Sequence, residues 1–167
     1  PPGADVTTMN IVDTAITNEP YFIETETIER MYPPTRTLES ASHTISGQTY
    51  GNGLYETSSS TAYSSFLAHT AFKTSDITGF SAADGQYNTG SYIGTNNIVS
   101  GYNGDWIKIK LPNPIKLTKY GFKKRPGAPH VFDYRCPGLY KIYGSNDNGN
   151  WDVLVHKTSY PSYTGQI

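Results

Sequence analysis

The stretch YKIYGSNDNGNWDVLV, residues Tyr140–Val155, decides how this chain is expected to fold. Apolar and polar residues alternate on both sides of a Ser-Asn-Asp-Asn-Gly segment, and a period of two indicates half-buried β-strands. Asn and Gly supply the positive-φ positions that a tight connection between two strands needs. The stretch therefore predicts an antiparallel β-hairpin.

The composition is typical of a single β-rich domain with a nearly neutral surface. The 167 residues suffice for one hydrophobic core and are few for two full domains. Charged residues make up only 16%, the net charge is −1 and no block of like charge occurs, so we expect no binding to nucleic acid. Because no apolar run approaches the ~18 residues of a membrane span, we expect no membrane insertion either.

The strongest single strand pattern lies in residues Trp106–Leu111. It places Ile107, Ile109 and Leu111 on one face and two lysines on the other, so the apolar face is expected in the core. Strands and helices do not alternate, which favours an all-β fold: an antiparallel β-sandwich. Weaker patterns predict strands at residues 44–46, 54–58 and 115–122, and one helical turn within residues 62–72.

A proline pair divides the chain into two parts. Pro33 and Pro34 follow Met31-Tyr32, and consecutive prolines stop regular strand pairing. We therefore expect residues 1–31 to form an extended arm or linker and residues 32–167 to form the folded domain. The apolar segment Tyr21-Phe22-Ile23 leaves open whether the arm docks on a neighbouring subunit.

Several motifs point to a known family. The hairpin reads G-S-N-D-x-G-x-W-x-x-L, and it follows a G-x-W strand at Gly104–Leu111, an Ala71-Phe72 pair and an Arg135-Cys136-Pro137 segment. In this order the motifs resemble those of discoidin, or coagulation factor 5/8 type C, domains. The resemblance implies a jelly roll of the galactose-binding-like fold. The sequence of residues 50–55 most resembles that of copies of the domain in large DNA viruses of algae.

Two departures from the family pattern concern calcium and the closing strands. Many family members follow the Ala-Phe pair with an Asp that holds a structural Ca²⁺, whereas Lys73 stands here, and an ammonium group disfavours a divalent cation. Asp76 and Asp84 remain candidate ligands, so Ca²⁺ stays an open alternative and no metal site is assigned. The family also continues past the hairpin, so the closing strands are expected from the arm, from a partner chain or from a longer polypeptide.

The loops carry the residues that we expect to contact a ligand. Saccharides combine an apolar C–H face with directional hydroxyls, so their sites pair aromatic rings with a few donors and acceptors. Family members that bind galactose often use an Arg after the strand similar to residues 120–122, which implies a role for Arg125. The candidate ligand-binding residues are Tyr50, Asn52, Tyr55, Phe80, Tyr87, Arg125, His130, Tyr134 and Arg135.

Sequence motifs for catalysis do not occur in this chain. It contains no Gly-x-Ser-x-Gly elbow and no HExxH helix, and its one Cys and four His show no zinc-ligand spacing. We therefore expect a non-catalytic, carbohydrate-binding module that recognises glycans or glycoproteins in cell adhesion or host attachment. It would act outside the cell, on a cell surface or on a virion.

Two other functions stay open. Exposed tyrosines are also typical of protein interfaces, so the alternative is a structural virion, capsid or fibre protein whose sandwich packs against other subunits. An enzyme, or a domain accessory to a hydrolase, is the second alternative.

Overall fold

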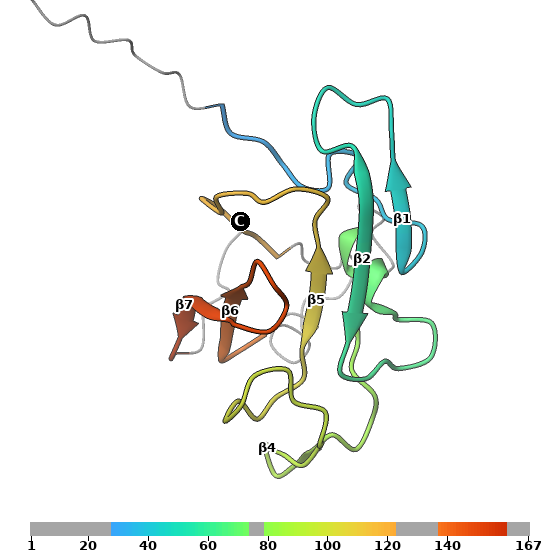
Figure 1. Ribbon diagram of the computed structural model, residues 1–167. Helices are drawn as coiled ribbons and strands as arrows, with labels where there is room; N and C mark the ends of the chain where they lie inside the picture. The colour runs from blue at the N-terminus through green and yellow to red at the C-terminus, as the bar shows by residue number, and fades with distance from the viewer. Residues whose placement is uncertain (1–27, 74–78, 123–136, 160–167) are drawn as a thin grey trace, which may run out of the picture.

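The computed structural model of this chain describes residues 28–73, 79–122 and 137–159. Within them, short strands and one 3₁₀-helix alternate with loops, and all strand pairs are antiparallel (Figure 1). The expected all-β class is therefore confirmed for this part of the chain. In chain order the elements are β1 (Ser42–Ile45), β2 (Gly53–Ser59), η1 (Ala68–Phe72), β3 (Tyr87–Asn88), β4 (Ser91–Tyr92), β5 (Ile107–Lys110), β6 (Tyr140–Gly144) and β7 (Asp152–Lys157).

The strands form three small sheets. The largest has the order β1-β2-β5, and the pairs β3-β4 and β6-β7 are separate two-stranded hairpins. Figure 1 shows β6 and β7 on the β5 side of the three-stranded sheet, and Lys108 Nζ of β5 donates to Asn148 Oδ1 of the β6–β7 turn at 2.8 Å. The described strands thus pair as expected, but they form three small sheets where the sequence predicted the two facing layers of a sandwich.

One face of the three-stranded sheet carries the core. Opposed residues of antiparallel strands share a face, so the pairing of Thr57 with Ile109 places both on the side of Tyr55. The expected inner face of residues 106–111 is confirmed for Ile109 and Leu111, whereas Ile107 at the start of β5 is 38% exposed. The buried cluster is Leu38, Ile45 and Tyr55, with Tyr32, Phe72, Ile109 and Leu111 packed against it.

The predicted helical turn is the short 3₁₀-helix η1. Its residues Ala68 and Thr70 are buried, and the Thr70 hydroxyl lies 2.7 Å from the carbonyl oxygens of both Leu67 and Gly79. Phe72, at the end of η1, packs against the core. Among the described residues the core is therefore covered by this helix and by the segment that contains Leu38. In that same part of the chain, no helix is long and apolar enough to cross a membrane.

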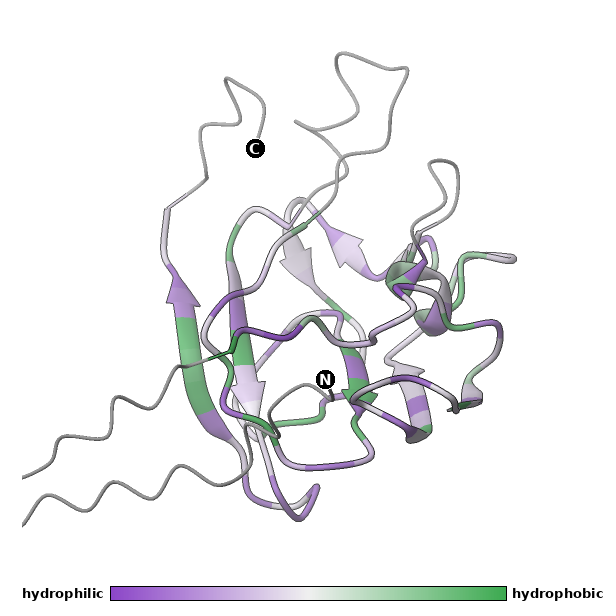
Figure 2. Ribbon diagram, turned by 90° about the horizontal axis from the view of Figure 1, so that it is seen from above, coloured by the Kyte–Doolittle hydropathy of each residue, from purple (hydrophilic) through white to green (hydrophobic). Residues whose placement is uncertain are grey.

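The hairpin expected from residues 140–155 is confirmed. β6 pairs with β7, and a bulge interrupts the register between Ile142 and Tyr143. Its strands are less buried than the alternation predicted, since Val153 and Leu154 are 52% and 51% exposed. Figure 2 shows this as a hydrophobic middle section of β7, the leftmost strand in that view.

One local prediction differs from the structure. Residues 115–122 contain no strand, contrary to the prediction, because the apolar positions change phase: Ile115 and Leu117 are odd-numbered, whereas Tyr120 and Phe122 are even-numbered. Such a segment cannot present one continuous apolar face as a strand.

The small hairpin β3-β4 was not predicted. It turns at Thr89 and Gly90, whose φ angles of 48° and 84° fit the two-residue connection that favours hairpins. The sequence gives no clear hairpin signal here, because Thr89 occupies the first turn position, where Asn or Asp is usual.

Candidate ligand-binding groove

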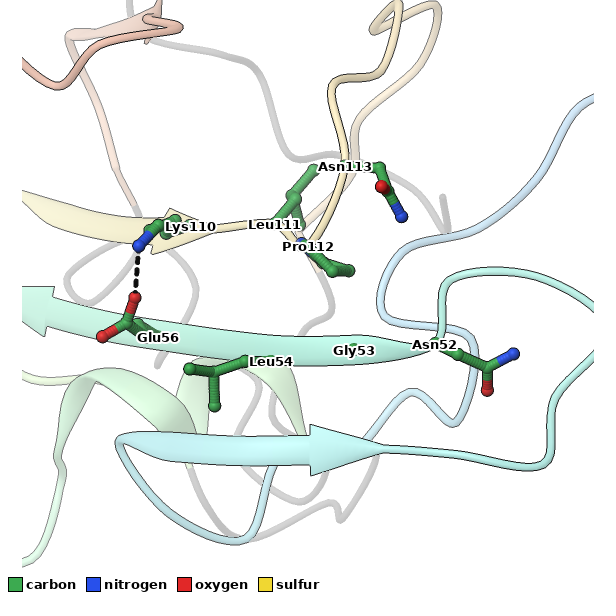
Figure 3. A pocket seen from close by; sticks show the side chains of 8 residues that line it. All are labelled: Asn52, Gly53, Leu54, Glu56, Lys110, Leu111, Pro112 and Asn113. Atoms are coloured by element: carbon green, nitrogen blue, oxygen red, sulfur yellow. Dashed lines mark hydrogen bonds and ion pairs between the residues drawn. The ribbon is translucent and has the colours of Figure 1, made fainter.

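A groove of about 330 Å³ lies where β2 begins and β5 ends (Figure 3). It opens on the face of the sheet opposite the buried Tyr55, because Glu56 and Lys110 alternate with the core residues of their strands. The lining combines two amides, one carboxylate, one ammonium and several apolar side chains: Asn52, Gly53, Leu54, Glu56, Lys110, Leu111, Pro112 and Asn113.

Glycine at position 53 allows the two chain segments of the groove to meet. Its φ is +127°, which side chains rarely adopt, and a Cβ built there would lie 2.6 Å from Pro112 Cβ. Only a residue without a side chain lets β2 start this close to the turn after β5. Gly53 therefore sets the shape of the groove at this end of the sheet.

Asn52 is held in place by the loop that joins β1 to β2. Its Oδ1 accepts from the Gln48 backbone N–H at 2.9 Å, and its Nδ2 donates to the Gln48 carbonyl oxygen at 2.6 Å. An amide has two donor hydrogens and two acceptor lone pairs, so one of each remains for a ligand. Asn52 is thus a pre-positioned hydrogen-bonding group on the rim.

Glu56 and Lys110 form a cross-strand ion pair inside the groove. They are directly opposed in the β2-β5 register, and Lys110 Nζ lies 2.6 Å from Glu56 Oε2 (Figure 3). The side chains are 71% exposed for Lys110 and 44% exposed for Glu56. An ion pair this exposed contributes roughly 0–1 kcal/mol to stability, so its charges are available to a ligand at little structural cost.

The loop that leads into the groove carries an aromatic ring with a cation. The Arg30 guanidinium carbon is 5.2 Å from the centroid of the Tyr50 ring, and Tyr50 meets Tyr32 edge-to-face at 5.7 Å. Tyr50 precedes Asn52 by two residues, a span of at most ~7 Å along the chain. The same loop therefore brings a partly exposed aromatic ring and an amide to one end of the sheet.

Three of the predicted ligand-binding residues belong to this end of the sheet. Asn52 lines the groove and Tyr50 adjoins it along the chain. Tyr55, in contrast, is fully buried and its hydroxyl donates to the Gly51 carbonyl oxygen at 2.7 Å, so the prediction that it contacts a ligand is wrong. Burial, followed by the nearby Tyr32 and Tyr50, raises the pKa of Tyr55, as expected for a core hydroxyl.

Phe80 and Tyr87 do not join this site. The Tyr87 hydroxyl accepts from the Asp105 backbone N–H at 3.1 Å, and Ser60, which follows β2, donates to the Asp105 carboxylate at 2.7 Å. Tyr87 therefore lies at the far end of β2, roughly 20 Å from its start for a seven-residue strand. Phe80 belongs to the segment whose Ser81 pairs with residues 63 and 66 near that end. Phe80 and Tyr87 thus lie at the end of the sheet opposite to Tyr50 and Asn52.

The remaining predicted site residues lie outside the described part of the chain. These are Arg125, His130, Tyr134 and Arg135, together with the candidate calcium ligand Asp76. The other candidate calcium ligand, Asp84, is exposed. Among the residues that the structure describes, no three His, Cys, Asp or Glu side chains come together as metal ligands.

Sequence reasoning missed most of the groove. Lys110 and Glu56 appeared only as polar positions of two strands, and their proximity depends on the register of β2 against β5, which no local pattern encodes. Asn113 stands between two prolines and belongs to none of the predicted strands. Arg30 was assigned to the arm. The one available signal was the Asn-Gly pair at 52–53, which marks a turn at the edge of a predicted strand.

Comparisons of the chain with family models, with curated proteins and with solved structures find no match.

Proposed function

We propose that this protein is a non-catalytic binding module that recognises cell-surface glycans, and that the groove at the β2–β5 end of the sheet is its ligand site. One observation carries the proposal. The groove combines amides, a carboxylate and an ammonium with apolar side chains. Such a mixture matches the alternating hydroxyls and C–H surfaces of a sugar ring.

The proposal gives each wall of the groove a role. Asn52 and Asn113 supply amide donors and acceptors for ligand hydroxyls, while Leu54 and Pro112 offer apolar surface to C–H groups. The groups suit reversible recognition, since the titratable side chains of the groove are an exposed pair that neutralise each other.

The proposed fold and location follow from the motifs that resemble discoidin domains. We propose that the described sheets belong to a galactose-binding-like jelly roll and that the protein acts outside the cell, in adhesion or host attachment on a cell or virion surface. Support comes from the hairpin at the G-S-N-D motif and from β5 at the G-x-W motif, since both motifs lie in or beside antiparallel strands.

The test is a glycan array probed with the full chain. We expect binding to a subset of glycans, and a loss of at least about tenfold in Asn52→Ala or Asn113→Ala, since each removes hydrogen bonds to the sugar. Asn103→Ala, an exposed asparagine outside the groove, is the matched control and should leave binding unchanged. A silent array, or equal binding by all three variants, would contradict the proposal.

A second candidate function is packing against other subunits of a virion, capsid or fibre. It is favoured by apolar side chains that are 44–54% exposed on the hairpin and on the segment before it. The ring centroids of Tyr120 and Phe122 lie 6.3 and 5.4 Å from that of Tyr140 in β6, both edge-to-face. The aromatic side chains of this region therefore form one cluster. We call this set the hairpin surface: Tyr120, Phe122, Leu139, Val153 and Leu154.

Sedimentation of the full chain separates this candidate from glycan binding. Self-association that is lost in Leu154→Ser would support an assembly role, because removing exposed apolar area weakens an interface without unfolding the protein. A monomer at all concentrations, combined with a positive glycan array, would contradict the subunit candidate in its homomeric form.

A further inference from the structure

We propose that the Glu56–Lys110 pair makes the groove selective for neutral saccharides with adjacent hydroxyls over sugars that carry a carboxylate. This inference rests on the proposed function and adds the chemical class of its ligand. It is carried by the position of the pair, which lies within the groove lining rather than beside it.

The pair presents complementary hydrogen-bonding groups close together. The Lys110 ammonium has three N–H donors and uses one on Glu56 Oε2, while Glu56 Oε1 has no hydrogen-bond partner among the described residues. A pair of neighbouring hydroxyls can therefore accept from the ammonium and donate to the carboxylate at the same time. Hydrogen bonds to charged groups are the stronger kind, which makes this the most directional part of the groove.

The same pairing disfavours an anionic ligand. A carboxylate placed against Lys110 would have to displace Glu56 or lie beside its negative charge, and like charges in contact are repelled. The described groove lining contains one cation and one anion, so it has no excess positive charge to offer an anionic sugar. Arg30 does not change this balance, because it is not part of the groove lining and its guanidinium lies over the Tyr50 ring.

The structure supplies a matched pair for comparison. Glu29 and Lys119 form an ion pair of nearly the same length, 2.7 Å, with similar exposure of 53% and 77%, and neither residue lines the groove. Neutralising either carboxylate removes one exposed charge and should leave the fold intact, since such pairs contribute roughly 0–1 kcal/mol. Any difference between the two variants then reports on the groove.

The experiment measures binding of the full chain, Glu56→Gln and Glu29→Gln to surfaces that display neutral hexoses or the corresponding hexuronates at equal density. We expect the wild type to prefer neutral hexoses by about tenfold or more, the size of effect that one charged contact gives. Glu56→Gln frees Lys110 and should reduce or reverse this ratio. Glu29→Gln should keep it.

Each outcome bears on one proposal or on both. A wild type that prefers hexuronates, or a ratio that is the same in Glu56→Gln and wild type, overturns the selectivity while glycan binding stands. No binding to either class overturns the proposed function itself. Lys110→Gln gives an independent check: it should weaken neutral binding without improving hexuronate binding, and a gain for hexuronates would contradict the role of the pair.

Discussion

The three-stranded sheet and the β6–β7 hairpin are both antiparallel, yet they are stabilised in different ways. The sheet buries Tyr55 and Leu38 completely on one face, under η1. The hairpin leaves Val153 and Leu154 about half exposed, and its order comes from its turn. There, the Asp147 carboxylate accepts from the backbone N–H groups of Gly149 and Asn150, both at 2.8 Å.

This difference shows which parts of the fold are local and which are not. A turn held by one carboxylate is encoded in a few consecutive residues. A buried face needs residues from β1, β2 and β5 that lie far apart in the sequence. The ligand groove belongs to the second kind, since it forms where β2 and the end of β5 meet.

The largest expected effect is the loss of the sheet core. Tyr55→Ala should lower the free energy of unfolding by about 3–5 kcal/mol, because it removes a fully buried aromatic ring. Tyr55→Phe keeps the ring and loses only the hydrogen bond to Gly51, so it should cost about 1 kcal/mol. Urea unfolding measures both. Equal effects of the two variants would show that the hydroxyl, and not the burial, matters.

The next effect concerns the backbone at the groove. Gly53→Ala should cost about 1–3 kcal/mol, since the residue has φ +127° and its new Cβ would meet Pro112. Gly47→Ala is the control, because its φ is also positive, +73°, but no atom lies within 4 Å of a Cβ there. We expect glycan binding to fall only in Gly53→Ala. An intact groove in that variant would contradict the close-contact explanation.

A smaller, local effect is expected in the hairpin turn. Hydrogen bonds from the backbone N–H groups of Asn150 and Gly149, then from the side chains of Asn150 and Ser145, hold the pKa of Asp147 well below its usual range. Asp147→Ala should therefore speed amide hydrogen exchange in β6 and β7 while β1 and β2 keep their protection. Equal acceleration in both sheets would mean that the two regions unfold as one unit.

The same carboxylate predicts a pH dependence. A pKa lowered by folding stabilises the hairpin above the pKa of the unfolded chain, near ~4, and this stabilisation is lost as the pH falls through the lowered pKa. The difference in hairpin exchange protection between wild type and Asp147→Ala should thus be constant from pH 7 to about 5 and shrink below ~4. A difference that grows on acidification would contradict the assignment.

The smallest effect is expected on the hairpin surface. Leu154→Ala removes a side chain that is already 51% exposed, so it should change stability by less than about 1 kcal/mol. Ile45→Ala, at 3% exposure, should cost about 2–5 kcal/mol. Thermal unfolding of the two variants compares the regions directly. A Leu154 effect as large as that of Ile45 would show that the hairpin is packed against a partner.

The sequence predicted those features that depend on a few consecutive residues. The Ser-Asn-Asp-Asn-Gly turn predicted the hairpin, and the alternation of Ile109 with lysines predicted β5 and its inner face. The placement of the three small sheets and the burial of Tyr55 depend on register and packing between distant segments, which a single pattern does not encode. For the same reason the predicted site residues are not all brought together: Asn52 lines the groove, while Tyr87 lies at the other end of the sheet.

The most direct test of the ligand site is a titration of the ¹⁵N-labelled full chain with the best-binding neutral saccharide, followed by nuclear magnetic resonance. We expect chemical-shift changes at the backbone amides of Gly53 and Asn113 and at the side-chain amide of Asn52, with the amides of β6 and β7 unchanged. Changes confined to the β6–β7 hairpin, or no changes at saturating saccharide, would contradict the account.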